Sequence, residues 1–164
     1  MDREEFSRRV NAMMDRLYRI TYGQLREPQD RMDAVQEALL KAWSGRHRLR
    51  KPEYFETWLI RILINECHNV QRRQRRTAPL DSAPEAAEDD RRLDALFGRD
   101  PAVREAILGL SEKLRIVVIL HYMEDYPVEE VARVLRLPRE TVRTRLRRAR
   151  AALRMTLEAS GEEE

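Results

Sequence analysis

The 164-residue sequence contains only five glycines and 6% aromatic residues. A β-sandwich or barrel needs frequent tight turns and β-rich runs, so both architectures are disfavoured. Cys67 is the only cysteine, which excludes an internal disulfide. The longest aliphatic run, residues 116–120, is far shorter than the roughly 20 apolar residues that span a bilayer. Residues 1–5 also lack the apolar core of a signal peptide, and we therefore expect a cytoplasmic protein.

The sequence motifs of common enzyme classes are also missing. The chain has no glycine-rich phosphate loop, no G-x-S-x-G and no H-E-x-x-H. Its histidines, His47, His68 and His121, are scattered, and the neighbours Cys67 and His68 would point to different faces of a helix. We therefore expect no enzymatic activity, with no catalytic residues, metal site, cofactor or small-molecule substrate.

Charge is abundant and unevenly distributed. Apolar residues make up 42% of the chain, a fraction too high for general disorder. Charged residues make up 37%, well above the ~25% of typical globular chains. The net charge is only +3, yet basic residues gather in 46–51, 72–76 and 133–154, and acidic residues in 81–90 and 162–164. Basic clusters of this kind indicate nucleic-acid contact, although charge alone fits a solvated surface equally well.

Apolar residues recur every three or four positions in residues 1–76, which predicts three amphipathic helices at about 2–24, 31–43 and 53–75. The stripe of the first helix is Phe6, Val10, Met13, Leu17 and Ile20. Proline breaks the pattern at residues 27–30, where we expect Asp30 to cap the second helix. Three such helices can share a small core, which makes residues 1–76 a first domain.

Residues 77–99 are predicted to be a flexible acidic linker, because residues 77–90 are rich in Ala, Pro, Ser, Asp and Glu. A short amphipathic piece is expected at 91–97. A second domain, residues 100–158, begins near Pro101, with helices expected at 101–109 and about 112–123. The predicted fold class is therefore all-α, with two small helical domains joined by a linker.

Residues 127–154 are the most informative stretch, because they predict a helix-turn-helix. A short helix at 127–135 leads through a turn at 136–138 into a long helix from Arg139 to Arg154. The small Ala132 suits the point where the two helices cross, Leu137 suits the turn, and Val142 would face the first helix.

The outer face of the long helix is strongly cationic. Residues 139–154 contain seven arginines and one acid, Glu140, so pairing at i, i+4 cannot neutralise the helix. Arginine can bond phosphate oxygens or the acceptor edge of guanine, and threonine can reach bases or phosphates. We therefore predict DNA contacts by Arg139, Thr141, Arg143, Thr144, Arg147, Arg148 and Arg150.

A second candidate surface lies along one stripe of the third helix. Proteins that bind single strands combine a basic groove with aromatic side chains, and this stripe has Tyr54 and Trp58 beside Arg61 and Arg72. Both aromatic residues could instead fill the core of the domain, and the sequence leaves that alternative open.

Two motif sets then give the chain a family resemblance. Residues 110–132, 141–146 and 148–150 resemble region four of an extracytoplasmic-function (ECF) sigma factor of the sigma-70 family. Residues 17–20, 33–43 and 55–62, the last reading Phe-Glu-Thr-Trp-Leu-Ile-Arg-Ile, are similar to region two of the same family. The resemblance covers nearly the whole chain except the linker and the tail. It implies an alternative sigma factor, a dissociable initiation subunit of bacterial RNA polymerase, acting in a stress response.

The resemblance also implies partners and roles. The second helix would dock on the clamp helices of the largest polymerase subunit through Asp33, Gln36, Glu37 and Lys41. The third-helix stripe, to which Asn65 also belongs, would hold the non-template strand of the minus-ten element. The basic loop would hold the same strand through Arg46, Arg48, Arg50 and Lys51. Residues 139–148 would read the minus-thirty-five element, with region four near the polymerase flap. An anti-sigma factor, often membrane-anchored in this family, is a further expected partner.

The alternative is a free-standing helix-turn-helix regulator with an N-terminal sensing or dimerising domain. Such a protein would bind duplex DNA tightly by itself, usually as a dimer on repeated half-sites. The chain also departs from the family at two points. Arg136 replaces a common turn glycine, so a left-handed conformation there would carry a modest cost and the shape of the turn stays open. The loop 44–53 lacks the usual Gly-Glu-Ser type sequence, so the base that it selects is not predicted.

Overall fold

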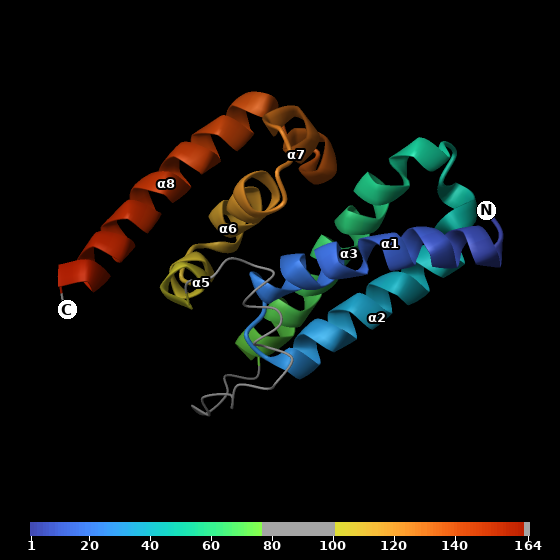
Figure 1. Cartoon of the computed structure of the whole chain (residues 1–164), viewed down its shortest axis with the longest axis horizontal. Helices are drawn as coiled ribbons and strands as arrows, with labels where there is room; N and C mark the ends of the chain where they lie inside the picture. Colours follow the sequence, from blue (N-terminus) through green and yellow to red (C-terminus); the bar gives the residue numbers. More distant parts are fainter. Residues whose placement is uncertain (77–100, 163–164) are drawn as a thin grey trace.

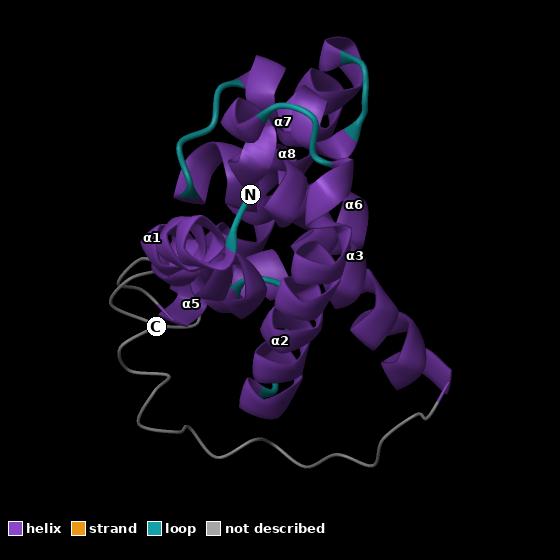
Figure 2. Cartoon of the chain, turned by 90° about the vertical axis from the view of Figure 1, so that its right-hand side faces the viewer, coloured by secondary structure: helices purple, strands orange, loops and turns teal. Residues whose placement is uncertain are grey.

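The computed structural model describes residues 1–76 and 101–162, and within these ranges all regular structure is helical (Figures 1 and 2). The first lobe, residues 1–76, contains the helices α1 (Arg3–Tyr22), α2 (Pro28–Gly45) and α3 (Phe55–Arg76), with short 3₁₀ turns at Arg46–Arg48 and Pro52–Tyr54. The second lobe, residues 101–162, contains α5 (Pro101–Leu108), α6 (Glu112–Val118), the turn η3 (Ile119–Met123), α7 (Val128–Leu135) and α8 (Arg139–Glu162). The all-α prediction is confirmed. The predicted linker and the piece at 91–97 lie outside the described residues.

Helix α1 follows its sequence pattern closely. The Asp2 carboxylate accepts a hydrogen bond from the Glu5 backbone N–H at 2.8 Å, which caps the first turn. All five residues of the predicted stripe are buried, among them Leu17 and Ile20 at 1% and 0% exposure. This stripe packs against α2 and α3 and supplies the centre of the first lobe.

Helix α2 corrects one prediction, because Asp30 does not cap it. The helix begins at Pro28, with Glu27 at the N-cap position and no side-chain cap. Proline fits the first turn, where its missing N–H is not needed, and the helix therefore starts earlier than the pattern suggested. The Asp30 carboxylate instead accepts a hydrogen bond from the Gln74 side chain of α3 at 2.5 Å.

The predicted helix over 112–123 is interrupted at its end. From Ile119 the backbone widens into a π-helical turn, and the Glu124 N–H donates to the Ile119 carbonyl at 3.0 Å. Asp125 then adopts a left-handed conformation with φ 61°. The wider turn ends α6 and directs the following residues, 124–126, toward the first lobe.

The helix-turn-helix is confirmed, and its turn is now defined. Arg136 lies in the left-handed region at φ 56° and ψ 48°, and the Leu137 N–H donates to the Ala132 carbonyl at 3.0 Å. This is the helix-ending geometry that usually takes glycine. Ala132 and Val142 are both buried where α7 and α8 meet. The turn therefore has the ordinary shape despite the arginine.

The two lobes pack against each other. Helix α3 of the first lobe contacts α7 of the second, and the buried apolar residues of both lobes form one connected cluster. Within the described residues, no helix is both long enough and apolar enough to cross a membrane.

Candidate nucleic-acid interface

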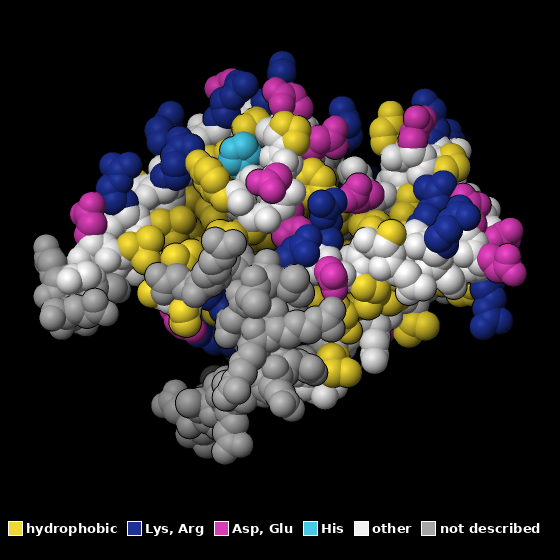
Figure 3. Space-filling model, in the orientation of Figure 1, with side chains coloured by type: hydrophobic (Ala, Val, Ile, Leu, Met, Phe, Trp, Pro, Cys, Tyr) yellow, Lys and Arg dark blue, Asp and Glu magenta, His cyan; other side chains and the backbone are white. Residues whose placement is uncertain are grey.

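One side of α8 is anchored in the second lobe and the other side is open. Val142, Leu146 and Ala149 have at most 2% exposure, so the residues between them project outward. All five predicted arginines of this helix are exposed, and Thr141 and Thr144 are half-buried. In Figure 3, Lys and Arg side chains follow the edge along which α8 runs in Figure 1. The structure therefore brings the predicted DNA-contacting set together on one helix.

Nearby acids neutralise this face only in part. Arg143 pairs with Glu140 at 2.5 Å, and Arg139 lies 3.7 Å from Glu129. Arg150 donates to the Tyr122 hydroxyl at 2.7 Å. Arg147 and Arg148 form no ion pair with any residue that the structure describes. A net cationic surface remains, which suits contact with a phosphate backbone.

The basic loop after α2 contains one structural arginine and three exposed cations. The Arg46 guanidinium stacks on the Trp43 ring, 3.6 Å from its centroid, and donates to the Trp43 carbonyl at 2.7 Å. It therefore ends α2 and fixes the loop. Arg48, Arg50 and Lys51 are exposed, and the Lys51 ammonium lies 5.9 Å from the centroid of the Tyr54 ring.

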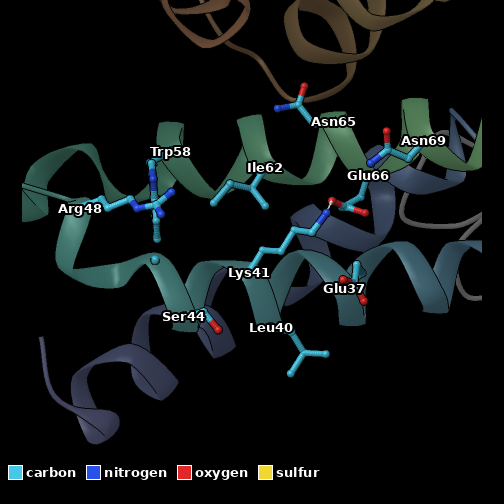
Figure 4. Close-up of a pocket in the computed structure, with 11 residues that line it drawn as sticks. Glu37, Leu40, Lys41, Ser44, Arg48, Trp58, Ile62, Asn65, Glu66 and Asn69 are labelled. Atoms are coloured by element: carbon cyan, nitrogen blue, oxygen red, sulfur yellow. Dashed lines mark hydrogen bonds and ion pairs between the residues drawn. The ribbon is translucent and has the colours of Figure 1, made fainter.

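A groove of about 610 Å³ runs between α2 and α3. Trp58 packs against the core and also lines this groove, with the Arg48 side chain beside it (Figure 4). Tyr54 is 44% exposed and is therefore not a core residue. For Trp58 both alternatives hold in part, because one side of the ring is buried and another is accessible.

The third-helix stripe is not one continuous surface. Asn65 and Arg72 are exposed. The Arg61 guanidinium instead turns toward α7, donating to the Val134 carbonyl at 3.0 Å and to the Arg133 carbonyl at 2.8 Å. Burial and the neighbouring Arg136 lower the pKa of Arg61. The structure therefore separates Arg61 from the other predicted strand-contacting residues.

The outward side of α2 is polar with two apolar exceptions. Asp33, Gln36 and Glu37 are exposed, as predicted. The Lys41 ammonium reaches across the groove to the buried Glu66 carboxylate (Figure 4), which raises the pKa of Lys41. Leu40 and Met32 are 62% and 43% exposed. Sequence reasoning missed both, although an apolar residue on the polar side of an amphipathic helix is a signal for docking.

The residues described, 1–76 and 101–162, contain no group of three or more His, Cys, Asp or Glu side chains that could hold a metal ion. Burial raises the pKa of the Cys67 thiol to about 12, so this cysteine is a core residue without a nucleophilic thiolate.

Comparisons with known proteins match both lobes. Residues 10–77 match the Sigma-70 region 2 family, and residues 101–153 match the Sigma-70, region 4 family. The ECF RNA polymerase sigma factor SigM of Mycobacterium tuberculosis is 32% identical over 152 residues, which cover 92% of this chain and 74% of SigM. The RNA polymerase sigma-E factor of Streptomyces avermitilis is 31% identical over 157 residues, which cover 94% of this chain and 86% of that factor.

Among solved structures, the sigma factor RpoE in complex with the anti-sigma factor NepR from Bartonella quintana has the same fold. It aligns with a TM-score of 0.76 at 22% identity, over 94% of this chain and 98% of RpoE. Two region matches in the expected order, with relatives above 30% identity along most of the chain, establish the family. The chain belongs to the ECF sigma factors of the sigma-70 family, the initiation factors of RNA polymerase.

Proposed function

We propose that this sigma factor binds core RNA polymerase through α2 and reads promoter DNA through α8 and the groove between α2 and α3. Its role is to direct core polymerase to a set of promoters in a stress response and to help open the DNA. The observation that carries the proposal is the arginine-rich face of α8 above the buried residues Val142, Leu146 and Ala149.

In the second lobe, α8 reads the minus-thirty-five element. Arg143 and Thr144 directly follow the buried Val142 and lie near the start of the helix, the part of a recognition helix that enters the major groove. Arg148 and Arg150 lie further along, where phosphate contacts are expected.

In the first lobe, the exposed side of α2 is the polymerase surface. Gln36 and Glu37 flank the exposed Leu40, so an apolar contact is surrounded by polar groups. Interface hot spots commonly have this arrangement, because the polar rim excludes water from the apolar centre. The clamp helices of the largest polymerase subunit are the proposed partner, and the flap region is the proposed neighbour of the second lobe.

The groove between α2 and α3 is the proposed site for the non-template strand of the minus-ten element. Trp58 and Arg48 line this groove, and the exposed Tyr54 and Lys51 lie together in the turn before α3. The aromatic rings suit stacking of unpaired bases, and the cations suit phosphates. An anti-sigma factor is a proposed further partner, because RpoE, which has the same fold, was solved in complex with the anti-sigma factor NepR.

In-vitro transcription with core polymerase on genomic fragments tests this proposal. New start sites should appear only when core polymerase and this chain are both present. At those promoters, Arg143→Ala should lose activity mainly where the upstream element matches, since a base-reading arginine contributes about 1–3 kcal/mol at one position. Arg150→Ala is the matched comparison and should lose activity equally at all upstream sequences, to an extent that depends on salt. The reason is that binding of this variant to DNA releases fewer counterions.

Two results would contradict the proposal. One is tight, specific duplex binding by the chain alone with no new start sites, as expected of a free-standing regulator. The other result concerns only the roles assigned to Arg143 and Arg150 of α8. If both alanine variants lose the same transcription activity across a panel of single-base upstream changes, Arg143 is not a base contact distinct from the phosphate contact of Arg150.

A further inference from the structure

The start of the chain holds both ends of the basic loop between α2 and α3, residues 46–54 (Figure 1). At the first end, Arg46 Nε donates to the Met1 carbonyl at 3.3 Å, just before α1 begins. At the second end, Arg9 Nη1 of α1 donates to the Pro52 carbonyl at 2.8 Å. The loop is therefore fastened by residues that lie 43 to 45 positions away in the sequence.

The Arg9 guanidinium is itself held by two further contacts. Its Nε and Nη2 atoms donate to the Glu5 carboxylate, one helical turn earlier, at 3.1 and 2.8 Å. It also lies 5.7 Å from the centroid of the ring of Phe55, the first residue of α3. A guanidinium is planar and donates in fixed directions. Because Nε and Nη2 are already engaged, the remaining Nη1 is directed at the Pro52 carbonyl.

The Pro52 carbonyl lies where the loop turns into α3. It also accepts the Phe55 backbone N–H, and the Tyr54 N–H donates to the Lys51 carbonyl at 3.0 Å. These bonds form the short 3₁₀ turn that displays Lys51 and Tyr54, both of which are exposed. Arg9 therefore bonds to the turn that presents a cation and an aromatic ring side by side.

Aromatic packing beneath the loop acts on the helices and not on the loop backbone. The Phe6 ring of α1 packs edge-on against Trp43 and Phe55, with centroid distances of 5.1 and 5.8 Å. Trp43 lies in the last turn of α2 and Phe55 begins α3, so these rings fix where the loop leaves one helix and enters the next. The Arg9 hydrogen bond adds a restraint on the loop backbone itself.

We propose that Arg9 is a positioning residue for promoter recognition: by holding the Pro52 carbonyl, it keeps Lys51 and Tyr54 in the arrangement that meets an unpaired base of the non-template strand. A loop that is fixed before binding loses less conformational freedom when the strand binds, and this preorganisation favours the base that fits its shape. The anchoring step stands on the contacts alone, whereas the consequence for base selection rests on the proposed function of the loop.

The anchoring step is tested in the full chain without DNA, by amide hydrogen exchange of the peptide 47–54 followed by mass spectrometry. Arg9→Met should speed exchange in this peptide about fivefold, as expected for the loss of one hydrogen bond, while it keeps an apolar stem beside Phe55. Arg8→Met is the matched control, because it makes the same change at the neighbouring, exposed position of α1, and it should exchange like wild type.

Glu5→Ala is a second variant, used if Arg9→Met fails to fold. It removes the carboxylate that directs the Arg9 guanidinium, so it should speed exchange of the same peptide by a smaller factor. Wild-type exchange rates in the folded Arg9 variant, or in Glu5→Ala where that variant replaces it, would overturn the anchoring step.

Base selection is tested by transcription with core polymerase on templates that carry single-base changes in the minus-ten or the minus-thirty-five element. Wild type should prefer one base at the minus-ten position that the loop reads, and Arg9→Met should lower this preference about fivefold. Its preferences in the minus-thirty-five element should stay as in wild type, because α8 reads that element. Arg8→Met should keep both sets of preferences.

Two results would overturn the positioning role of Arg9. One is faster loop exchange with an unchanged minus-ten preference, and the other is an equal loss at every template, as expected if the variant only destabilised α1. Failure of the proposed function is a different result: wild type would then give no new start sites with core polymerase. The positioning role would fall with it, whereas hydrogen exchange would still decide the anchoring step.

Discussion

Arg136 is an arginine in a backbone conformation that favours glycine, at φ 56° and ψ 48°. For a residue with a Cβ this region costs about 1 kcal/mol or more, because the Cβ approaches the following carbonyl oxygen. The left-handed turn forms nonetheless, since the Leu137 N–H to Ala132 carbonyl bond and the packing of Val142 fix the angle between α7 and α8. Backbone strain is therefore stored at the helix-turn-helix.

The strain predicts a stabilising substitution. Arg136→Gly should raise the free energy of unfolding by about 1 kcal/mol relative to Arg136→Ala, because both variants remove the charge beside Arg61 but only glycine removes the Cβ. Urea denaturation of the two variants measures the difference. Equal stability of the two variants, or a less stable glycine variant, would show that the turn carries no strain from the side chain.

At the scale of helices, sequence periodicity predicted most of the fold. The apolar stripes of α1 and of the helix-turn-helix are buried as expected, because a helix with one apolar side is stable only when that side packs against the core. The pattern failed where polar groups decide the geometry. It did not reveal the π-helical turn after Val118, nor that Arg31 is 2% exposed and donates to the Leu25 and Arg26 carbonyls. From the sequence alone, an arginine is expected at the surface, because the carbonyl groups that allow its burial cannot be identified.

In the candidate site too, the sequence predicted which side chains are exposed but not which distant residues they contact. The cationic face of α8 was predicted from the excess of arginine over acidic residues. The exposed polar side of α2 was predicted from the positions of its apolar residues. Arg61 was placed correctly on its helix but not in its contacts, because the residues that it meets lie more than 70 positions away at Arg133 and Val134. No local pattern encodes a contact of that separation.

The exposed side of α2 predicts a separation between binding and folding. Replacing both Gln36 and Glu37 by alanine should weaken binding to core polymerase about tenfold, since interface residues that matter contribute more than ~1 kcal/mol each. Thermal stability should change little, because both residues are exposed and the core of the lobe does not use them. Titration of labelled chain with core polymerase measures the affinity.

The control for α2 is Glu4→Ala, which removes an exposed acid on α1 while leaving α2 intact. Its affinity for core polymerase should equal that of the wild type. If the double variant on α2 also binds with wild-type affinity, the polymerase surface lies elsewhere.

At the scale of the whole molecule, contacts of very different weight connect the lobes. The Arg26 to Glu105 pair has a distance of 2.8 Å, but both side chains are more than half exposed, and such surface pairs contribute about 0–1 kcal/mol. The Glu124 carboxylate of the second lobe is different, because it is fully buried and pairs with Arg16 and Arg19 of α1. Its loss leaves Arg19 without its carboxylate partner at the boundary, whereas Arg16 keeps its pair with Glu56. The buried apolar residues that run through both lobes also hold the lobes together. The arrangement of the lobes should therefore depend on Glu124 far more than on the exposed pairs.

This difference predicts how the chain unfolds. Wild type should melt in one transition with equal calorimetric and van't Hoff enthalpies, the mark of a single cooperative unit, because neither lobe can unfold without exposing the shared apolar boundary. Glu124→Ala should split the melt into two transitions, one for each lobe, since it weakens the boundary while leaving the core of each lobe intact. Glu105→Ala removes an acid from an exposed pair at the same boundary and should keep the single transition. Scanning calorimetry of the three proteins decides the matter: two transitions already present in wild type would show that the lobes are energetically independent, and a single transition in all three would assign their cohesion to apolar packing and not to Glu124.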